Sequence, residues 1–449
     1  MRTGLVWMAL LTALLVLALS LSACNCDDDD DDDNNNDNDD ECIVCEGTSE
    51  CTDALGTGWV CLYGCCVEFD ADDDATDDDA TDDDATDDDA TDDDDDDDFT
   101  WTIEELDRIG PGSRQISLAI GSDETLYIAY TGCSDGSCEN SDLFFAWLTP
   151  DKAVWETTVV DSQTGDLGWY PALALDDADH PHILYAEHSQ TKLRYATATV
   201  LDNWTVTPLN GAGRGGLWNA AVYADGMLVT AHTSLPPSGW DGDLGFGYLT
   251  GSSWTFLDID TDGDCGWFTE MTVTPDGRPV IAYIRGYPAG YQNIMTYDDG
   301  DWDVVQVDDG SYGGEIVVTD DGYYHLAYPK GDPQNGDLWD LWYATNAPAG
   351  EWTKVMIDGG SDAEEDTGGF PAIAADADGG LHVTYRNFSL GALMYARKAP
   401  GGDWEYDVAD AIGGGLYSDV EIDGNGVLHI AYENGTKLRY AVCDNCTDY

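Results

Sequence analysis

Lysine and arginine are scarce in this chain. They account for 16 of 449 residues, against 91 aspartates and glutamates, and the net charge is −75. Residues 99–449 alone hold 56 acids and 15 bases, which leaves a net charge near −41. A field of that sign repels nucleic acid and anionic lipid, so neither is expected as a partner. Cationic partners, metal ions and plain solubility remain as roles for the surface charge.

Sequence signatures of catalysis are missing as well. The chain contains no phosphate-binding loop, no nucleophile elbow and no His-Glu-x-x-His zinc motif. Beyond residue 98, no segment shows the 3.6-residue apolar period of a helix. We therefore expect an all-β protein without a cofactor or a metal site, and we favour a non-catalytic role.

The first residues have the pattern of a targeting segment. Arg2 precedes an almost wholly apolar run, residues 5–21. The segment Leu21-Ser22-Ala23-Cys24 stands at the end of this run. This pattern resembles the bacterial lipobox, and the resemblance implies cleavage before Cys24 and lipid attachment to its sulfur. An ordinary secretory signal or a retained membrane helix are the alternatives. We expect an extracytoplasmic lipoprotein of the outer membrane or cell surface, which touches the membrane only through its lipid anchor.

Changes of composition divide the chain into five parts. They are a lipoprotein signal peptide (1–23), a lipidated cysteine with an acidic linker (24–41), a small cysteine-rich module (42–69), a poly-aspartate linker (70–98) and the main domain (99–449). Residues 27–41 hold 11 acids and residues 70–98 hold 20, so self-repulsion predicts two disordered, extended linkers. Calcium chelation by the aspartates is the alternative.

Cysteine usage agrees with an oxidising compartment, since twelve cysteines follow Cys24. Six of them cluster within the cysteine-rich module, at Cys42, Cys45, Cys51, Cys61, Cys65 and Cys66. So short a module cannot build a core, and we expect about three disulfides, with a metal site as the alternative. Two more pairs are expected to close local loops, namely Cys133 with Cys138 and Cys443 with Cys446. Cys26 and Cys265 have no obvious partner.

Seven tryptophans recur at near-even intervals. They are Trp101, Trp155, Trp204, Trp254, Trp302, Trp352 and Trp404, separated by 54, 49, 50, 48, 50 and 52 residues. One unit shows the pattern, with short apolar segments at 371–375, 381–385, 392–396 and 404–408 and an Asp-Gly turn after the first. Because the apolar period within these segments is two, each unit predicts four antiparallel strands.

The first and last units are each incomplete. Trp101 has no unit before it, and the last unit, residues 419–440, has no tryptophan after it. We expect a strand at 100–105 to complete the last sheet beside residues 438–442, which removes an exposed edge. Seven such sheets around one axis form a seven-bladed β-propeller of four-stranded antiparallel blades. We expect a monomer.

Aromatic side chains recur within the predicted strands and are expected to fill the wedges between neighbouring sheets. The second-strand positions are Tyr130, Tyr185, His232, Tyr283, Tyr328, Tyr385 and Tyr432. The third-strand positions are Phe145, Tyr195, Tyr248, Tyr297, Tyr343, Tyr395 and Tyr440.

The repeats have the form Pro-Ala-Ile-Ala-x-Asp-x-Asp-Gly-x-x-His-Val-x-Tyr, then Leu-x-Tyr-Ala, then Trp. In this they resemble the propeller units of sialidase-like, Asp-box (BNR) repeat proteins over about residues 99–446. The resemblance implies the fold and leaves the function open, because propellers host lectins, scaffolds and hydrolases. The Asp-Gly turns here follow the first strand, whereas in Asp boxes they follow the third.

The loops before each first strand and after each second strand should emerge on one face, which we call the looped face. Glycine followed by aromatics recurs there, and the candidate binding residues are Trp169, Tyr170, Trp218, Trp267, Phe268, Phe370 and Tyr417. The series is broken by Arg114-Gln115 and by Gly313-Gly314. Flat rings stack on sugar faces, and the alternative is that these rings cap the core.

Charged residues follow the second strands on the same face, and we include Glu187, Arg285, Arg386 and Glu433 among the candidate binding residues. A sialidase-like enzyme would use an arginine cluster and a carboxylate there. Four histidines share one register, at His182, His325, His382 and His429, and lie on four different sheets, so they cannot meet at one metal.

These features favour a non-catalytic binding module for a glycan or an extracellular or periplasmic polypeptide. A sialidase-like glycoside hydrolase and a structural envelope protein without a small ligand are the alternatives.

Overall fold

The structure is a computed structural model that describes residues 59–62, 65–68, 99–109, 115–133, 140–163, 165–209, 214–286, 290–331, 338–348, 350–360 and 365–449. It separates into two compact units, residues 1–86 and 87–449. In the first unit, β1 (Trp59–Leu62) and β2 (Cys65–Glu68) pair as an antiparallel hairpin. Cys24, Cys26, Cys138, Arg114 and the acidic linkers lie outside the described residues, as do the side chains of the cysteine-rich module. The expectations for them remain predictions.

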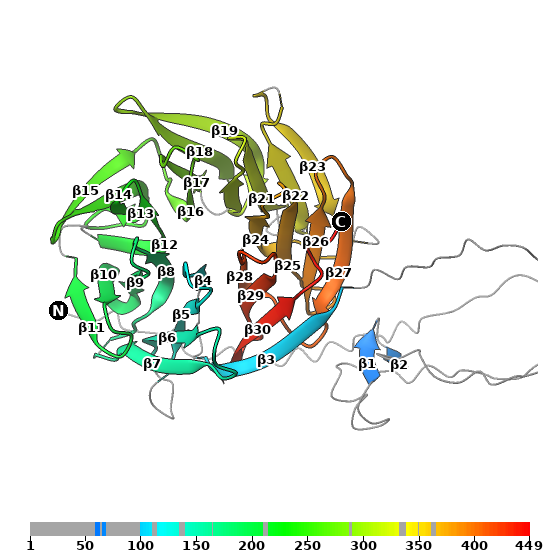
Figure 1. Cartoon of the computed structure of the whole chain (residues 1–449). Helices are drawn as coiled ribbons and strands as arrows, with labels where there is room; N and C mark the ends of the chain where they lie inside the picture. Colours follow the sequence, from blue (N-terminus) through cyan, green and yellow to red (C-terminus); the bar gives the residue numbers. More distant parts are fainter. Residues whose placement is uncertain are drawn as a thin grey trace, which may run out of the picture. The chain divides into compact units, whose positions relative to one another are not determined.

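The described residues of the second unit are all-β, with 28 strands in four-stranded antiparallel sheets that surround a central axis (Figure 1). In chain order the strands are β3 (Trp101–Arg108), β4 (Ile116–Ile120), β5 (Leu126–Gly132), β6 (Asp142–Leu148), β7 (Glu156–Asp161), β8 (Trp169–Leu175), β9 (Pro181–Glu187), β10 (Lys192–Ala198), β11 (Trp204–Pro208), β12 (Arg214–Ala224), β13 (Met227–Leu235), β14 (Asp243–Thr250), β15 (Ser253–Asp260) and β16 (Trp267–Val273). They continue as β17 (Pro279–Arg285), β18 (Gly290–Asp298), β19 (Asp301–Ser311), β20 (Glu315–Val318), β21 (Tyr324–Lys330), β22 (Asp340–Thr345), β23 (Thr353–Asp358), β24 (Gly369–Ala375), β25 (Leu381–Asn387), β26 (Ala392–Lys398), β27 (Trp404–Asp410), β28 (Leu416–Ile422), β29 (Leu428–Glu433) and β30 (Lys437–Cys443). One pairing, Ser311 with Lys330, joins two of the sheets into an eight-stranded one.

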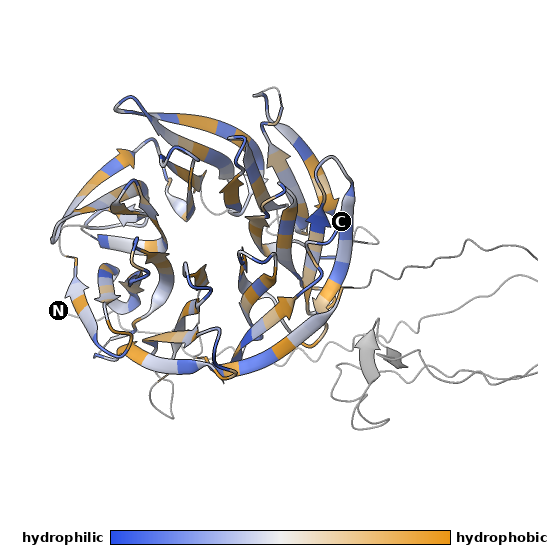
Figure 2. Cartoon of the chain, in the orientation of Figure 1, coloured by the Kyte–Doolittle hydropathy of each residue, from blue (hydrophilic) through white to orange (hydrophobic). Residues whose placement is uncertain are grey.

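The four strands predicted from residues 371–408 are present as β24, β25, β26 and β27, in that order across one sheet. The turn after β24 closes with a hydrogen bond from Gly379 N to Asp376 O (3.1 Å). Gly379 has φ of 86°, a left-handed conformation that glycine adopts without a steric penalty. Hydrophobic and hydrophilic residues follow one another in short bands along the strands (Figure 2).

The expected pairing of the first strand of this unit with the last is confirmed. β3 lies antiparallel to β30, with Trp101 opposite Cys443 and Ile103 opposite Ala441. The sheet order β28-β29-β30-β3 therefore joins segments more than 300 residues apart in sequence. The outer edge of β30 is thereby covered.

The second-strand aromatics occupy the wedges between sheets, as predicted. Tyr130, Tyr185, Tyr283, Tyr328, Tyr385 and Tyr432 are all fully buried. Their hydroxyls donate to aspartates at or near the ends of the preceding outer strands, over 2.5–2.8 Å, at Asp107, Asp161, Asp260, Asp308, Asp358 and Asp410. A buried hydroxyl needs such a partner, so each bond ties one sheet to the next.

Two third-strand assignments are wrong. The register places Phe246 opposite Ala231 and Ile294 opposite Ala282, so these two residues occupy the wedge position in β14 and β18. Tyr248 and Tyr297 lie further along, towards the hairpin turns that lead to β15 and β19. Long hairpins on these two sheets put an extra tyrosine near the turn.

The repeated tryptophans pack edge-on against third-strand aromatics of the neighbouring sheet. Ring centroids are 4.9–5.3 Å apart in the pairs Trp155–Tyr440, Trp204–Phe145, Trp254–Tyr195, Trp302–Phe246, Trp404–Tyr343 and Trp101–Tyr395. The histidine register is structural too, since each histidine Nδ1 lies 2.5–2.7 Å from a third-strand tyrosine hydroxyl, at Tyr195, Tyr343, Tyr395 and Tyr440.

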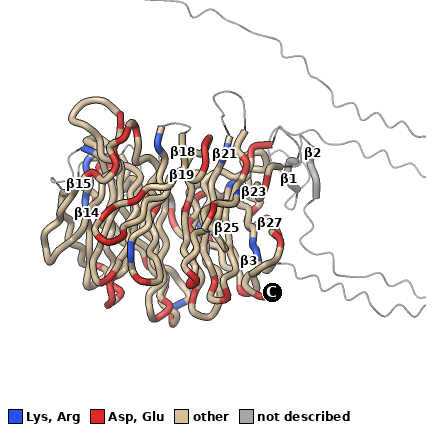
Figure 3. Tube along the Cα trace, turned by 90° about the horizontal axis from the view of Figure 1, so that it is seen from above, with Lys and Arg blue, Asp and Glu red and all other residues tan. Residues whose placement is uncertain are grey.

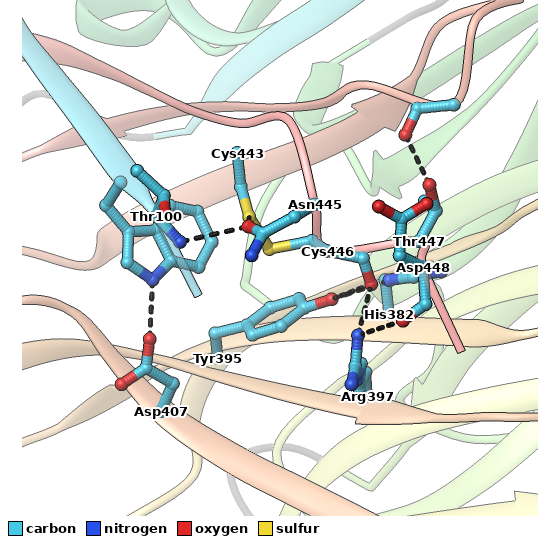
Figure 4. The surroundings of a disulfide bond; sticks show 12 residues. Thr100, His382, Tyr395, Arg397, Asp407, Cys443, Asn445, Cys446, Thr447 and Asp448 are labelled. Carbon is cyan, nitrogen blue, oxygen red and sulfur yellow. Dashed lines mark hydrogen bonds between the residues drawn. A yellow bond between two sulfur atoms is a disulfide. The ribbon is translucent and has the colours of Figure 1, made fainter. Parts of the chain in front are cut away.

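The predicted disulfide between Cys443 and Cys446 is present. It lies near the start of β3 and near Tyr395 and Arg397 of β26 (Figure 4). The Thr100 amide donates to Asn445 Oδ1 (3.0 Å), and Arg397 Nη1 donates to the carbonyls of Cys446 (3.1 Å) and Asp448 (2.7 Å). Cys265 is a buried free thiol. We call residues 443–449 the C-terminal clasp.

Helix is almost absent from the described residues, which include a single 3-10 turn, His188–Gln190. None of the described segments forms a helix long and apolar enough to cross a membrane. Acidic segments lie at both ends of the strands and outnumber the basic ones (Figure 3).

Candidate functional site

The looped face is the edge where first strands begin and second strands end. In one sheet, for example, Trp169 at the start of β8 pairs with Ala186 near the end of β9. At equivalent positions there, five aromatic residues adopt left-handed backbone conformations, with φ of 47–51° at Tyr170, Trp218, Phe268, Phe370 and Tyr417. We call these five residues the aromatic collar. For bulky residues this conformation costs about 1–3 kcal/mol each, and such strain gathers at functional sites.

A β-bulge produces this conformation. The register of the first strand slips between Trp169 and Ala172, and again at the four other collar positions. A bulge changes the direction of a side chain, and here it directs the collar rings to the central channel, which all five line. The glycine two residues earlier is required by space: a Cβ on Gly216 would lie 2.8 Å from Leu193 Cα of the neighbouring sheet.

The collar is divided into two arcs. Tyr170, Trp218 and Phe268 form one, with ring centroids 4.8 and 4.9 Å apart. Phe370 and Tyr417 form the other, at 4.3 Å. The two remaining positions carry Gln115, also left-handed at φ 66°, and Gly313. A Cβ on Gly313 would lie 2.5 Å from Phe268 Cβ, so the fifth position has no room for an aromatic ring.

Two of the predicted aromatic residues lie away from the channel. Trp169 stacks on His188 at 3.6 Å and donates to Ser141 Oγ (2.9 Å). Trp267 is buried in the core and donates to Asp264 Oδ1 (2.6 Å). For these two, the interpretation as core caps fits the packing better than ligand contact.

Four carboxylates line the channel beneath the collar: Glu270 on β16, Glu315 on β20, and Asp419 and Glu421 on β28. We call them the channel carboxylates. The cavity measures about 1000 Å³, and no lysine, arginine or histidine is among its described lining residues. Gln115 Nε2 donates to Glu270 Oε1 (3.0 Å) and so connects β4 to β16, and the Leu118 amide donates to Asp419 Oδ2 (2.7 Å).

Burial raises the pKa of all four channel carboxylates, because desolvation disfavours the ionised form. The charge of Asp419 raises the pKa values of Glu270, Glu315 and Glu421 further. For Glu421 the resulting pKa is about 8. The raised pKa values favour the protonated form of these carboxylates.

Two of the predicted charged residues after the second strands form ion pairs, Arg285 with a neighbouring sheet and Glu187 within its own sheet. Arg285 pairs with Asp260 (2.5 Å) and Asp262 (3.3 Å), and the buried Glu187 accepts from Arg194 Nη1 (3.1 Å). Asp260 also accepts a hydrogen bond from the hydroxyl of the wedge residue Tyr283 (2.5 Å).

Arg386 and Glu433 lie further round the same face, at the ends of β25 and β29. Arg386 donates to the Gly414 carbonyl and lies 5.3 Å over the Phe388 ring. Burial lowers the pKa of Arg386, and the charge of the buried Glu433 opposes that shift. Neither residue lines the channel.

The channel carboxylates, Gln115, Tyr312 and Trp339 were not among the predicted site residues. A sequence signal existed for the acids: Glu270, Glu315 and Asp419 each follow the collar position by two residues, where Ala172, Ala220 and Ala372 stand on other sheets. Trp339 follows a long loop, and its ring lies 5.1 Å from Tyr312 and 6.3 Å from Phe370, which partly fills the gap at Gly313.

Comparison with known proteins identifies the fold. No family model matches the sequence, and no curated protein does. A solved polysaccharide lyase, a PL25 ulvan lyase, aligns with a TM-score of 0.51 at 12% identity, covering 75% of this chain and 96% of that chain; its complex with -[GlcA(1-4)Rha3S]- gives the same values. The NanB sialidase of Streptococcus pneumoniae gives a TM-score of 0.46 at 12% identity, covering 76% of this chain and 70% of that one. At such identities the likeness to the lyase shows a β-propeller fold alone.

Proposed function

We propose that this chain is a cell-envelope lipoprotein that displays a closed seven-bladed β-propeller, and that the propeller binds a glycan at the mouth of its channel without transforming it. The aromatic collar carries this proposal. Five aromatic residues with strained backbone conformations lie at equivalent positions and line one channel. Backbone strain of this kind is typically found at functional sites. Aromatic rings beside a few polar groups in a concave site are typical of ligand binding.

The contacts between first strands support seven blades in a closed ring. β4 contacts β8, and the series continues through β12, β16, β20 and β24 to β28, which contacts β4 again. β3 supplies the outer strand of the last blade. On this view each blade presents one position to the collar, and two of the seven positions are left without a ring.

The anchoring part of the proposal rests on the sequence. The apolar run that ends in Leu21-Ser22-Ala23-Cys24 favours a lipid anchor at Cys24, and residues 24–98 would serve as the tether. A glycan of the envelope or its surroundings is the ligand class that such a position offers.

A sialidase-type mechanism receives little support from the charges. Such an enzyme needs an arginine cluster for the substrate carboxylate, whereas Arg285 is engaged by Asp260 and Asp262. The channel carboxylates favour a different second candidate, the hydrolysis of a glycan without acidic groups. Glu270 and Asp419 interact electrostatically, and a protonated acid beside a carboxylate is the pair that glycosidases use.

A glycan-array screen of the full-length protein, purified in detergent, tests the proposal. We expect binding to a defined set of glycans that is lost in Trp218→Ala and Tyr417→Ala. Trp240→Ala is the matched control, because Trp240 is 58% exposed on the looped face outside the channel. Binding that survives both collar substitutions would refute a site at the collar.

Turnover separates the two candidates. Incubation of the bound glycans with the wild-type protein should release no product under the binding proposal. Product that disappears in Glu270→Gln would establish the hydrolase instead.

A further inference from the structure

The channel beneath the collar points to one class of glycan. We propose that the ligand is an oligosaccharide of an amino sugar with a free amine, whose ammonium group enters the channel and pairs with Glu270 and Asp419 while its rings stack on the collar. The inference rests on the proposed function and names the substrate class of the same site.

The channel is strongly acidic. The described lining of the channel carries four carboxylates and no basic side chain, within a domain whose net charge is near −41. A uronate or a sialate would bring its carboxylate close to these acids, and like charges in a site of low dielectric repel strongly. Acidic glycans are therefore disfavoured, and a cation is favoured.

Two amide side chains of the channel lining have an acceptor without a partner among the described residues. Asn219 lines the channel and is 2% exposed. Its Nδ2 donates to the Tyr170 carbonyl (2.9 Å), but its Oδ1 has no partner among the described residues. Gln115 shows the same asymmetry, since Nε2 donates to Glu270 and Oε1 has no partner. Both open groups are acceptors, which favours a ligand that donates hydrogen bonds.

An ammonium group meets these requirements. It offers three hydrogen-bond donors and no acceptor, and its positive charge pairs with the negative carboxylates. The collar adds to this, because a cation within about 6 Å of an aromatic face is attracted by the ring quadrupole. A neutral sugar hydroxyl could satisfy one acceptor, but it would leave the carboxylates without a counter-charge.

Binding should also release protons. The groups that titrate around the channel are the four channel carboxylates together with Tyr170, Tyr223, Tyr312 and Tyr417. Burial raises the pKa values of Glu270, Asp419 and Glu421, and the charge of Asp419 adds to the shift of the two glutamates. An ammonium group beside them favours their ionised form and expels protons near neutral pH.

Isothermal titration calorimetry of the full-length protein tests the proposal. The probes are glucosamine tetrasaccharide and its fully N-acetylated counterpart, which lacks the charge. Salt of about 0.5 M suppresses loose attraction of the cation to the acidic linkers. We expect the amine form to bind about tenfold or more tightly than the N-acetyl form, with proton release detected as different apparent enthalpies in phosphate and Tris buffers.

The E270Q/D419N variant should lose that preference and the proton release, while D378N, an exposed aspartate on the opposite face, should retain both. Both substitutions replace a carboxylate by an amide of nearly the same shape, so the fold should be retained. Near-UV circular dichroism of the variant checks this.

The outcomes separate the two proposals. Equal binding of both oligosaccharides, dependent on Trp218 and unaffected by E270Q/D419N, would refute the amine inference and leave the glycan site standing. Binding of neither would count against both. Tetralysine or CaCl2 binding that requires Glu270 and Asp419, without oligosaccharide binding, would overturn the glycan class in favour of a peptide or a metal ion.

Discussion

The indole Nε1 of Trp101 donates to Asp407 Oδ2 over 2.6 Å, across 306 residues of sequence. The same indole lies edge-on to Tyr395, with ring centroids 5.2 Å apart. Trp101 therefore fixes β3 to the neighbouring sheet as well as to β30, and the residue with which the repeat series begins also completes its last member.

Trp101→Ala should lower the free energy of unfolding by about 3 kcal/mol, because it removes a packed indole and leaves Asp407 without its donor. Urea unfolding followed by circular dichroism measures the change. Trp240→Ala, on an exposed loop, should change it by less than about 0.5 kcal/mol. Equal effects of the two substitutions would contradict the role of Trp101.

Deletion of residues 99–108 is the stronger form of this test. It leaves the edge of β30 unpaired, so we expect a larger radius of gyration in small-angle scattering and concentration-dependent aggregation. A compact, monomeric deletion variant would show that β3 is dispensable.

The C-terminal clasp should stabilise the domain through its disulfide. The bond closes a four-residue loop, for which chain entropy gives about 2 kcal/mol. The double variant Cys443→Ser/Cys446→Ser should unfold at correspondingly lower urea, and it should release Asn445 from Thr100. Limited proteolysis of residues 443–449 reports that release, and an unchanged cleavage rate would speak against the clasp.

The left-handed backbone of the collar residues predicts that glycine is a more stabilising replacement there than alanine. Tyr417 has φ of 49°, which glycine adopts freely and alanine does not. Tyr417→Gly should therefore be more stable than Tyr417→Ala by about 1 kcal/mol, although glycine is normally the less stable replacement. Both variants lose the ring and should lose glycan binding alike. If the alanine variant is the more stable in urea unfolding, the left-handed conformation is not present in solution.

Glu421 makes the stability of the protein depend on pH. Its folded pKa is about 8, against an ordinary value of 4.5, so the folded state retains a proton that the unfolded chain loses. Stability from this group is therefore present below pH 4.5 and is lost as the pH rises towards 8. Glu421→Gln should stabilise the protein by at least about 1 kcal/mol at pH 8 and have little effect at pH 4.5.

Glu351→Gln is the matched control for this measurement, since Glu351 is exposed. Thermal or urea unfolding at the two pH values measures both variants. A gain from Glu421→Gln that does not depend on pH would mean that the carboxylate is ionised throughout.

The strands and the pairing of β3 with β30 could be predicted from signals in the sequence. The period-two segments at 371–408 and the recurring tryptophans place each strand, and the unmatched Trp101 indicates its partner. Tyr248 and Tyr297 were misassigned because the pattern did not reveal how far the β14–β15 and β18–β19 hairpins extend.

The site was predicted only in part, for reasons of backbone geometry and pairing. A bulge decides whether Trp169 or Tyr170 faces the channel, and the one-residue difference is invisible in a Gly-Trp-Tyr sequence. Gly216-Leu217-Trp218 did indicate which position faces the channel, because only the second residue after the glycine is aromatic there. The channel carboxylates were obscured by the large number of acids elsewhere in the chain.

Hydrogen–deuterium exchange of the full-length protein, with and without the glycan selected on the array, tests the central claim most directly. We predict protection at the starts of β8, β12, β16, β24 and β28, where the collar residues lie, with the outer strands unchanged. Protection confined to outer strands, or to the Asp-Gly turns of the opposite face, would contradict a binding site at the channel mouth.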